Sequence, residues 1–130
     1  MNLSVPDFDE SAFRNKSNKI LTKGLFYELS YYSPENCIFT LKNQDYVKDG
    51  KTYFSLKKLY LAIVPQDPTE YIFAQTVFKS WEVWDVIRNS PQLKEYVKAW
   101  RDEVAVRIKS DAIQAIANEM HSNGRNGFQA

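Results

Sequence analysis

The segment 67–89 contains two short helical patterns joined by too few residues for anything except a sharp turn. Asp67 and Pro68 are typical of a helix start, because an aspartate oxygen accepts hydrogen bonds from free amides and proline has no amide hydrogen to leave unpaired. Glu70 can reach back toward this start as in a capping box, and Ser80 is a suitable N-cap for the second helix. The apolar or small positions expected inside the pair are Ile72, Phe73, Ala74, Val77, Trp84 and Ile87. The pattern predicts a helix-turn-helix, with an ordinary helical hairpin as the alternative.

Two positions of this segment are informative about the turn and the crossing. Ala74 falls where two steeply crossing helices approach most closely, so a larger side chain there would push them apart. Phe78 stands where a turn glycine is common in such motifs.

The chain before this pair is expected to form an arm and a small mixed structure. Residues 1–18 are polar apart from isolated apolar points, and we expect a flexible N-terminal arm. Residues 19–30 show a helical pattern, and residues 37–54 favour a small β-hairpin, with an irregular loop as its alternative. Ser55 is a plausible N-cap for a further helix ending at Pro65, the first of a three-helix domain.

The longest periodic segment follows Asn89, with Ser90 and Pro91 marking its start. A single helix over residues 91–120 would be roughly 45 Å long at 1.5 Å per residue, longer than a domain of this size is wide. Part of it would then project, and a projecting apolar stripe needs a partner. The alternative is a helical hairpin with a break near residues 109–111. The predicted oligomerisation residues recur every three to five positions, and the stripe rotates along the helix: Leu93, Val97, Trp100, Val104, Ile108, Ile113, Ile116 and Met120.

The expected fold is therefore mainly α, in three parts: the arm 1–18, a helix-turn-helix domain with a hairpin insertion over 19–89, and a helical oligomerisation region over 90–130. The chain ends HSNGRNGFQA, which has a loop composition followed by Phe128 as the first residue of another element. We expect a terminal segment to be missing there.

Charge and composition limit the chemistry of this chain. The formal net charge is only +1, from 17 Lys and Arg against 16 Asp and Glu, so nucleic-acid binding would need a local patch or several copies. His121 is the only histidine and Cys37 the only cysteine, and no glycine-rich phosphate loop is present. We predict a non-enzymatic protein without metal or cofactor. The absence of a signal peptide or membrane-spanning run predicts a soluble cytoplasmic protein.

DNA contacts, if the pair is a helix-turn-helix, would come from the exposed side of its second helix. Acids on that side are unfavourable beside phosphates, so we expect weak docking by one copy. The alternative is that the lysines form an ordinary solvated surface. The candidate residues are Lys57, Lys58 and Lys79 for phosphates, and Ser80, Trp81, Glu82, Asp85 and Arg88 on the recognition helix.

Two stretches, FAQTVFKSWEVWDVIRN and SPQLKEYVKAWRDEVAVRIKSDAIQAIA, resemble the small terminase subunits of tailed bacteriophages. The resemblance covers about residues 56–130, with YFSLKKLYL and DPTEYIFAQT as further recognisable phrases. It implies a helix-turn-helix that recognises the packaging site on double-stranded viral DNA, a helical region that builds a homo-oligomeric ring, and a C-terminal segment that engages the large terminase subunit. It also implies the cytoplasm of the infected bacterial host as the location. By position, it places Ser80, Trp81, Glu82 and Asp85 in the recognition helix and residues 93–120 in the oligomerisation helices.

Two other classes of protein remain open. One is a dimeric helix-turn-helix transcriptional regulator whose long helix is its dimer seam. The other is a structural or adaptor protein that does not bind DNA and uses the helical hairpin as a packing unit.

Overall fold

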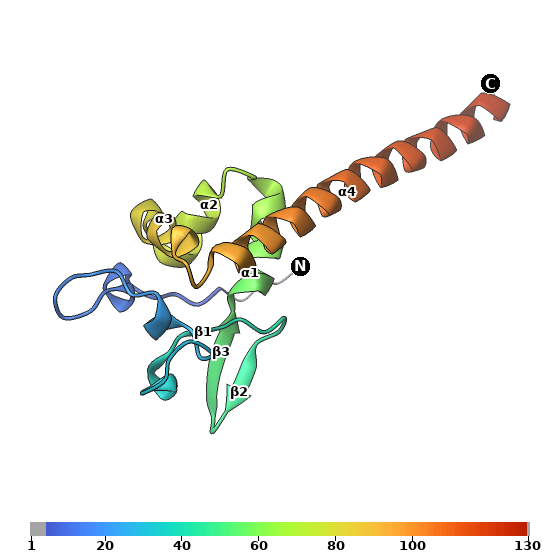
Figure 1. The fold of residues 1–130 in the computed structure, drawn as a ribbon. Helices are drawn as coiled ribbons and strands as arrows, with labels where there is room; N and C mark the ends of the chain where they lie inside the picture. Colours follow the sequence, from blue (N-terminus) through green and yellow to red (C-terminus); the bar gives the residue numbers. More distant parts are fainter. Residues whose placement is uncertain (1–4, 130) are drawn as a thin grey trace.

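Helices dominate the chain from residue 56 onward, and a small sheet precedes them. The computed structural model describes residues 5–129, with side chains described as far as His121. Figure 1 shows short helices grouped above the sheet, and a long helix that leaves this group and extends well beyond it. The predicted fold class, mainly α with a small β element and a long C-terminal helix, is confirmed at this level.

The helices begin where the sequence places its capping residues. Helix α1 (Leu56–Ile63) starts at Ser55, whose Oγ accepts a hydrogen bond of 3.1 Å from the amide of Lys58. A 3₁₀ turn, Val64–Gln66, follows α1 directly and contains Pro65. Helix α2 (Tyr71–Phe73) continues as a π-helical turn, η5 (Ala74–Phe78), and α3 (Trp81–Asn89) follows.

Helix α4 (Lys94–Gln129) is one continuous helix, so the alternative break near residues 109–111 does not occur. It starts three residues after Pro91, and Leu93, Val97 and Val104 pack into the core beside α1 and α3. Its backbone stays helical through residues 121–127, where the composition predicted a loop. Residues 105–121 are exposed throughout and form the projecting half of the helix.

The sheet contains β1 (Phe39–Thr40), β2 (Tyr46–Lys48) and β3 (Lys51–Ser55) in the order β1-β3-β2. Strands β2 and β3 form the predicted hairpin, with Asp49 and Gly50 both at positive φ, as a two-residue turn of this kind requires. Strand β1, which was not predicted as a separate strand, pairs with β3 in parallel. The first half of the predicted hairpin therefore pairs with β3 as a parallel third strand and not as its antiparallel hairpin partner.

The predicted helix over residues 19–30 is wrong. Only a 3₁₀ turn, Lys23–Leu25, forms there. Leu25 and Phe26 are neighbours and both are buried, and Phe26 forms a β-bridge with Phe39 while the amide of Tyr27 donates to the Phe39 carbonyl at 2.9 Å. The backbone of this segment pairs with the sheet edge, which a helix could not do.

The predicted flexible arm is also corrected, for the part of it that the structure describes. Phe13 is fully buried, and its ring lies 5.0 Å from that of Phe78 and 6.3 Å from that of Phe39. Arg14 forms a β-bridge with Ile20. An isolated phenylalanine in a polar segment gives no periodic signal, although its burial ties residues 5–18 to the core.

Candidate nucleic-acid interface

The turn between η5 and α3 is the centre of the predicted interface. Lys79 adopts a left-handed conformation with φ of 60°, which lets the chain reverse without a glycine. Ser80 caps α3 as predicted, its Oγ accepting a 3.3 Å hydrogen bond from the amide of Val83. Phe78 is fully buried, stacked on Trp84 with ring centroids 5.6 Å apart. A buried aromatic residue and a left-handed lysine thus occupy the place of a turn glycine.

The start of the first helix differs from the prediction. Helix α2 begins at Tyr71, and Ile72, predicted to be buried, is 51% exposed. Asp67 still caps this start, because its carboxylate accepts hydrogen bonds from Thr69 and from the amide of Ile72, and these lower its pKa. Phe73, Ala74, Val77, Trp84 and Ile87 are all fully buried, as predicted.

Glu70 explains the shifted start, and its role is different from the predicted capping-box partner. It is 3% exposed and sits at φ of 72°, immediately before α2. Its carboxylate accepts hydrogen bonds from the Tyr60 hydroxyl, from Trp84 Nε1 at 3.1 Å, and from Arg101 Nε at 2.7 Å and Nη2 at 3.0 Å. One side chain therefore joins the start of α2 to α1, α3 and α4.

The ionisation of this cluster follows from its contacts. Burial acts to raise the pKa of Glu70, but hydrogen bonds from Arg101, Tyr60 and Trp84 outweigh it and hold the pKa below its ordinary value. Burial, with the neighbouring carboxylate, raises the pKa of Tyr60, and the hydrogen bonds to Glu70 raise that of Arg101. The carboxylate is thus charged and the phenol neutral at neutral pH. The partners lie 10, 14 and 31 residues from Glu70, so no local pattern reveals the cluster.

The outward side of α3 carries side chains that already contact one another. Trp81 is half-buried, with its ring 6.2 Å from that of Tyr71 and the Arg88 guanidinium 4.8 Å above it. Arg88 also pairs with Asp85 at 2.7 Å and reaches Glu70 at 3.5 Å. Glu82, on the first turn, lies 3.5 Å from Arg14. The predicted recognition residues therefore share a face that holds one arginine and two carboxylates.

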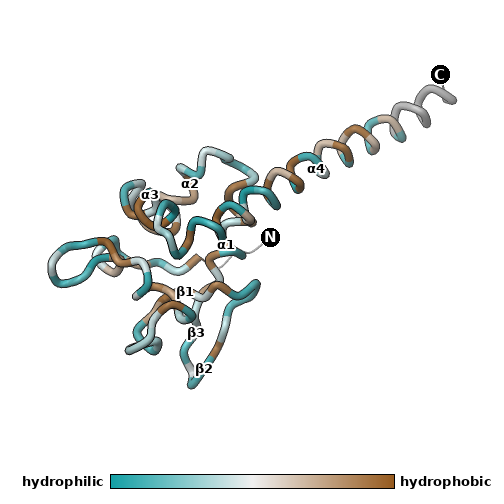
Figure 2. Tube along the Cα trace, in the orientation of Figure 1, coloured by the Kyte–Doolittle hydropathy of each residue, from teal (hydrophilic) through white to brown (hydrophobic). Residues whose placement is uncertain are grey.

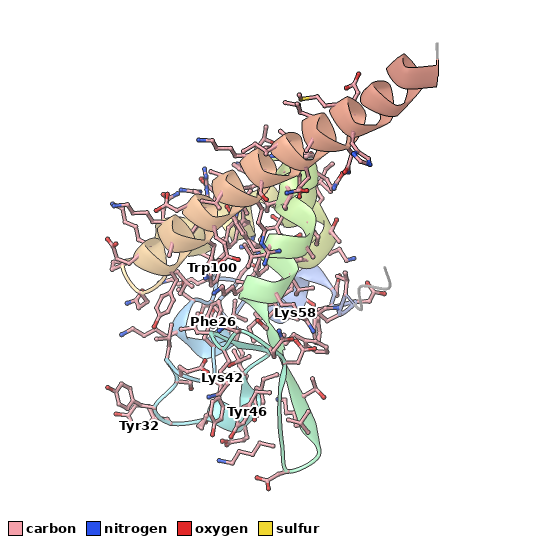
Figure 3. The ribbon with its side chains drawn as sticks, turned by 90° about the vertical axis from the view of Figure 1, so that its right-hand side faces the viewer. Phe26, Tyr32, Lys42, Tyr46, Lys58 and Trp100 are labelled. Carbon is pink, nitrogen blue, oxygen red and sulfur yellow. The ribbon has the colours of Figure 1, made fainter. Side chains whose placement is uncertain are left out.

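The three lysines predicted to contact phosphates are each beside a carboxylate. Lys58 lies 2.9 Å from Asp45, Lys57 lies 3.7 Å from Glu103, and Lys79 lies 3.2 Å from Asp7. Lys57 and Lys58 are on the first turn of α1, above the sheet, whereas Lys79 is in the turn before α3, so the structure does not gather them into one patch. Figure 3 shows Lys58 at the junction of α1 and the strands. Partly exposed pairs of this kind contribute only about 0–1 kcal/mol, so a phosphate can replace the carboxylate.

The predicted oligomerisation residues divide into two groups. Leu93, Val97, Trp100 and Val104 are between 0 and 4% exposed and belong to the core of this chain, so they are not available to another subunit. Figure 3 shows Trp100 on the side of α4 that faces the domain, and its ring lies 5.6 Å from that of Tyr60. The periodicity of these four residues is accounted for by the chain's own core, because a periodic stripe indicates that a face is covered without showing what covers it.

The second group lies on the projecting half and is exposed. Ile113, Ile116 and Met120 are 53%, 58% and 68% exposed, and Val106, which the prediction missed, is 66% exposed. At about 100° per residue, these four fall within roughly 80° of arc, on nearly the opposite side of α4 from the buried face. Ile108, at 37% exposure, lies on the same side of α4 as Val104, one turn beyond the last buried residue. We call Val106, Ile113, Ile116 and Met120 the distal stripe; the spacing of seven from Val106 to Ile113 and Met120 was its signal in the sequence.

Other kinds of site have little support in the described part of the chain. Within it, no group of three or more His, Cys, Asp or Glu side chains is placed to hold a metal ion. Cys37 is fully buried, and burial raises the pKa of its thiol. None of the described helices combines the length and the apolar character needed to cross a membrane.

Comparisons of this chain with protein-family models, with curated proteins and with solved structures give no match.

Proposed function

We propose that this chain is the small terminase subunit of a tailed bacteriophage, a DNA-packaging protein that binds double-stranded viral DNA as a homo-oligomeric ring. In this role it delivers the packaging site to the large terminase subunit in the cytoplasm of the infected host. The observation that carries the proposal is the distal stripe on a helix that leaves its own domain.

The projecting half of α4 is built for contact with another helix. Residues 105–121 extend roughly 25 Å at 1.5 Å per residue, and no other element of the described chain covers them. Figure 2 shows apolar residues recurring along this part. Val106, Ile113 and Met120 are spaced by seven with Ile116 between the last two, which is the spacing of a helix-helix seam. Exposed apolar surface of this extent is typical of an interaction site.

The orientation of the distal stripe favours neighbouring copies of the same chain. Because it lies on nearly the opposite side of α4 from the buried face, another α4 can approach it without meeting the domain. A head-to-tail contact of this kind closes as a ring when its rotation allows. The distal stripe therefore provides an interface that does not compete with the core.

We infer that α2, η5 and α3 act together as the helix-turn-helix of this subunit. Support comes from the sharp turn at Lys79, from the cap at Ser80 and from fully buried Ala74 between the helices. The DNA-facing residues on this model are Lys79, Ser80, Trp81, Glu82, Asp85 and Arg88, with Lys57 and Lys58 reaching phosphates from α1. Their acids make one copy a weak site, and a ring multiplies it by its copy number.

The proposal is tested by the mass of the assembly. Native mass spectrometry of the purified chain should show closed oligomers of more than four subunits. Ile113→Asp with Ile116→Asp should disperse them, because charges on the distal stripe would face apolar neighbours. Gln114→Asp with Asn118→Asp, on the polar side of the same turns, is the matched control and should keep the assembly. A monomer at micromolar concentration for the unchanged chain contradicts the proposal.

A dimeric helix-turn-helix regulator is the second candidate, because the same distal stripe closes as a dimer if the contact is isologous. A dimer in the mass spectrum that retains duplex DNA would favour it. Oligomers that retain no DNA would favour an adaptor protein.

A further inference from the structure

The sheet carries a positively charged surface, on the side of the hairpin away from Phe54. Tyr46 and Tyr53 are paired across β2 and β3 with ring centroids 6.0 Å apart, and the Tyr27 ring lies 5.3 Å and 4.9 Å from them. Lys48 and Lys51 form the pair two residues further along, so they emerge on the same side as these rings. With Lys42, whose ammonium lies 4.9 Å from the Tyr46 ring centre, these six residues define what we call the Tyr–Lys face.

The lysines of the Tyr–Lys face have neutral partners. Lys48 Nζ donates a 2.9 Å hydrogen bond to the Tyr27 hydroxyl and lies 5.6 Å from the centre of that ring. Lys51 Nζ lies 5.2 Å from the Tyr53 ring centre and donates to the backbone carbonyl of Glu35. No carboxylate of the described residues forms an ion pair with Lys42, Lys48 or Lys51, in contrast to Lys57, Lys58 and Lys79.

This arrangement holds like charges close together. Lysines directly opposite one another on neighbouring strands repel, and the rings offset this only in part. The hydrogen bond to Tyr27 raises the pKa of Lys48, so its charge is kept. The nearest acids along the chain are Asp45, which pairs with Lys58 at 2.9 Å, and Asp49, which is exposed in the turn, so the three lysines remain in local excess. A polyanion laid across the hairpin would relieve the repulsion.

Two exposed tyrosines precede a loop that is bonded to this face through Lys51. Tyr31 and Tyr32 are 92% and 97% exposed, so their rings are open to solvent on both sides. They precede the 3₁₀ turn Pro34–Asn36, and the bond from Lys51 to Glu35 ties this loop to the hairpin. Figure 3 shows Tyr32 extending from the lobe that also carries Lys42 and Tyr46.

We propose that the Tyr–Lys face, with Tyr31 and Tyr32, binds single-stranded nucleic acid. The three lysines contact successive phosphates, and the two exposed rings stack on bases, which is how proteins hold unpaired strands without sequence preference. A duplex keeps its bases stacked inside and leaves the rings unused. An acidic peptide would pair with the lysines but would leave the rings of Tyr31 and Tyr32 without stacking partners. The inference rests on the proposed function only in taking nucleic acid as the partner, and it concerns a different surface from the helix pair.

The test is fluorescence anisotropy with a labelled 30-residue oligo-dT and a labelled 30-base-pair duplex, titrated with the full chain at several salt concentrations. Lys42→Gln with Lys48→Gln and Lys51→Gln should weaken oligo-dT binding at least tenfold. The slope of log affinity against log salt concentration should become shallower by about 2, since each single-strand phosphate contact contributes about 0.7 to this slope. Tyr31→Ala with Tyr32→Ala should weaken oligo-dT binding about tenfold at unchanged salt dependence, because stacking releases no counterions. Neither should change duplex binding by more than twofold.

The matched control is Lys16→Gln with Lys19→Gln and Lys98→Gln, which removes the same charge from exposed positions elsewhere and should leave oligo-dT binding within twofold. Oligo-dT affinities equal to the control in both variants overturn the inference, and duplex binding then remains to be judged separately through the helix pair. An unchanged chain that binds neither strand form overturns the inference and the proposed function together. Binding of polyglutamate in place of oligo-dT overturns it in favour of an acidic peptide. Should the lysine variant fail to fold, the exposed Tyr31 and Tyr32 carry the test alone.

Discussion

The two halves of α4 have the same kind of apolar repeat and opposite environments. In the first, Trp100 and Val104 are 3% and 4% exposed and pack into the chain's own core. In the second, Ile113 and Ile116 are more than half exposed. The repeat of the second half is turned to the far side of the helix, so it cannot be an extension of the core. In α4, the apolar residues move to the opposite side of the helix at the point where the helix leaves its own domain.

The largest expected effect lies in the buried half. Trp100→Ala should destabilise the monomer by about 3 to 5 kcal/mol, because it removes a large side chain packed against Tyr60 and leaves a cavity. Urea denaturation followed by circular dichroism measures this. Tyr96→Ala, one turn away and 44% exposed, is the control and should cost less than 1 kcal/mol. A stable Trp100 variant that merely loses its oligomeric state would show that the first half also serves the interface.

The next largest effect is expected at Glu70, whose carboxylate binds Arg101 on the buried half of α4. Glu70→Gln should cost about 2 to 4 kcal/mol at neutral pH, because Arg101 loses its buried carboxylate and the amide cannot accept hydrogen bonds from Tyr60, Trp84 and Arg101 together. Glu119→Gln removes the same negative charge from an exposed position of α4 and is the control.

The stability lost in Glu70→Gln should depend on pH. The folded pKa of Glu70 is below its ordinary value of about 4.3, so its contribution is complete above that value and is lost as the pH falls through the folded pKa. The stability difference between the unchanged chain and Glu70→Gln should therefore be constant from pH 5 to 7 and shrink in more acidic solution. A difference that grows on acidification would mean that the carboxyl is protonated in the fold.

These positions show what the sequence can and cannot reveal. Ser55 and Ser80 were predicted as caps because capping is decided within three residues, and the turn at Asp49 and Gly50 is equally local. The repeat predicted a long helix as far as Met120, but α4 continues to Gln129, through residues whose composition predicted a loop. The Glu70 cluster was missed because its partners come together only through the packing of four helices.

The missed parts of the candidate surfaces have the same cause. The Tyr–Lys face depends on strand register, which sets Lys48 opposite Lys51, and on Tyr27, which arrives from a segment predicted to be helical. The carboxylate partners of Lys57, Lys58 and Lys79 are distant in sequence as well. The net charge follows from the composition, but the tertiary structure decides which charged side chains have an ion-pair partner.

A smaller effect is expected at the crossing of the helix pair, beside the buried half of α4. Ala74→Leu should destabilise by about 1 to 3 kcal/mol, because Ala74 is fully buried and a larger side chain must push the surrounding residues apart. Ala115→Leu makes the same substitution at an exposed position of α4 and is the control. An unchanged melting temperature for Ala74→Leu would contradict a close crossing and, with it, the helix-turn-helix interpretation.

The smallest effect on monomer stability is expected in the exposed half of α4. Ile113→Ala with Ile116→Ala should change the unfolding free energy of the dilute chain by less than about 0.5 kcal/mol, because both side chains are exposed and no core residue loses a contact. At concentrations where subunits associate, the same variant should lower the melting temperature, since association stabilises the folded chain by mass action. Melting curves recorded over a hundredfold range of protein concentration separate the two regimes. A concentration-independent loss above 1 kcal/mol would place the distal stripe inside the fold and end the distinction between the halves of α4.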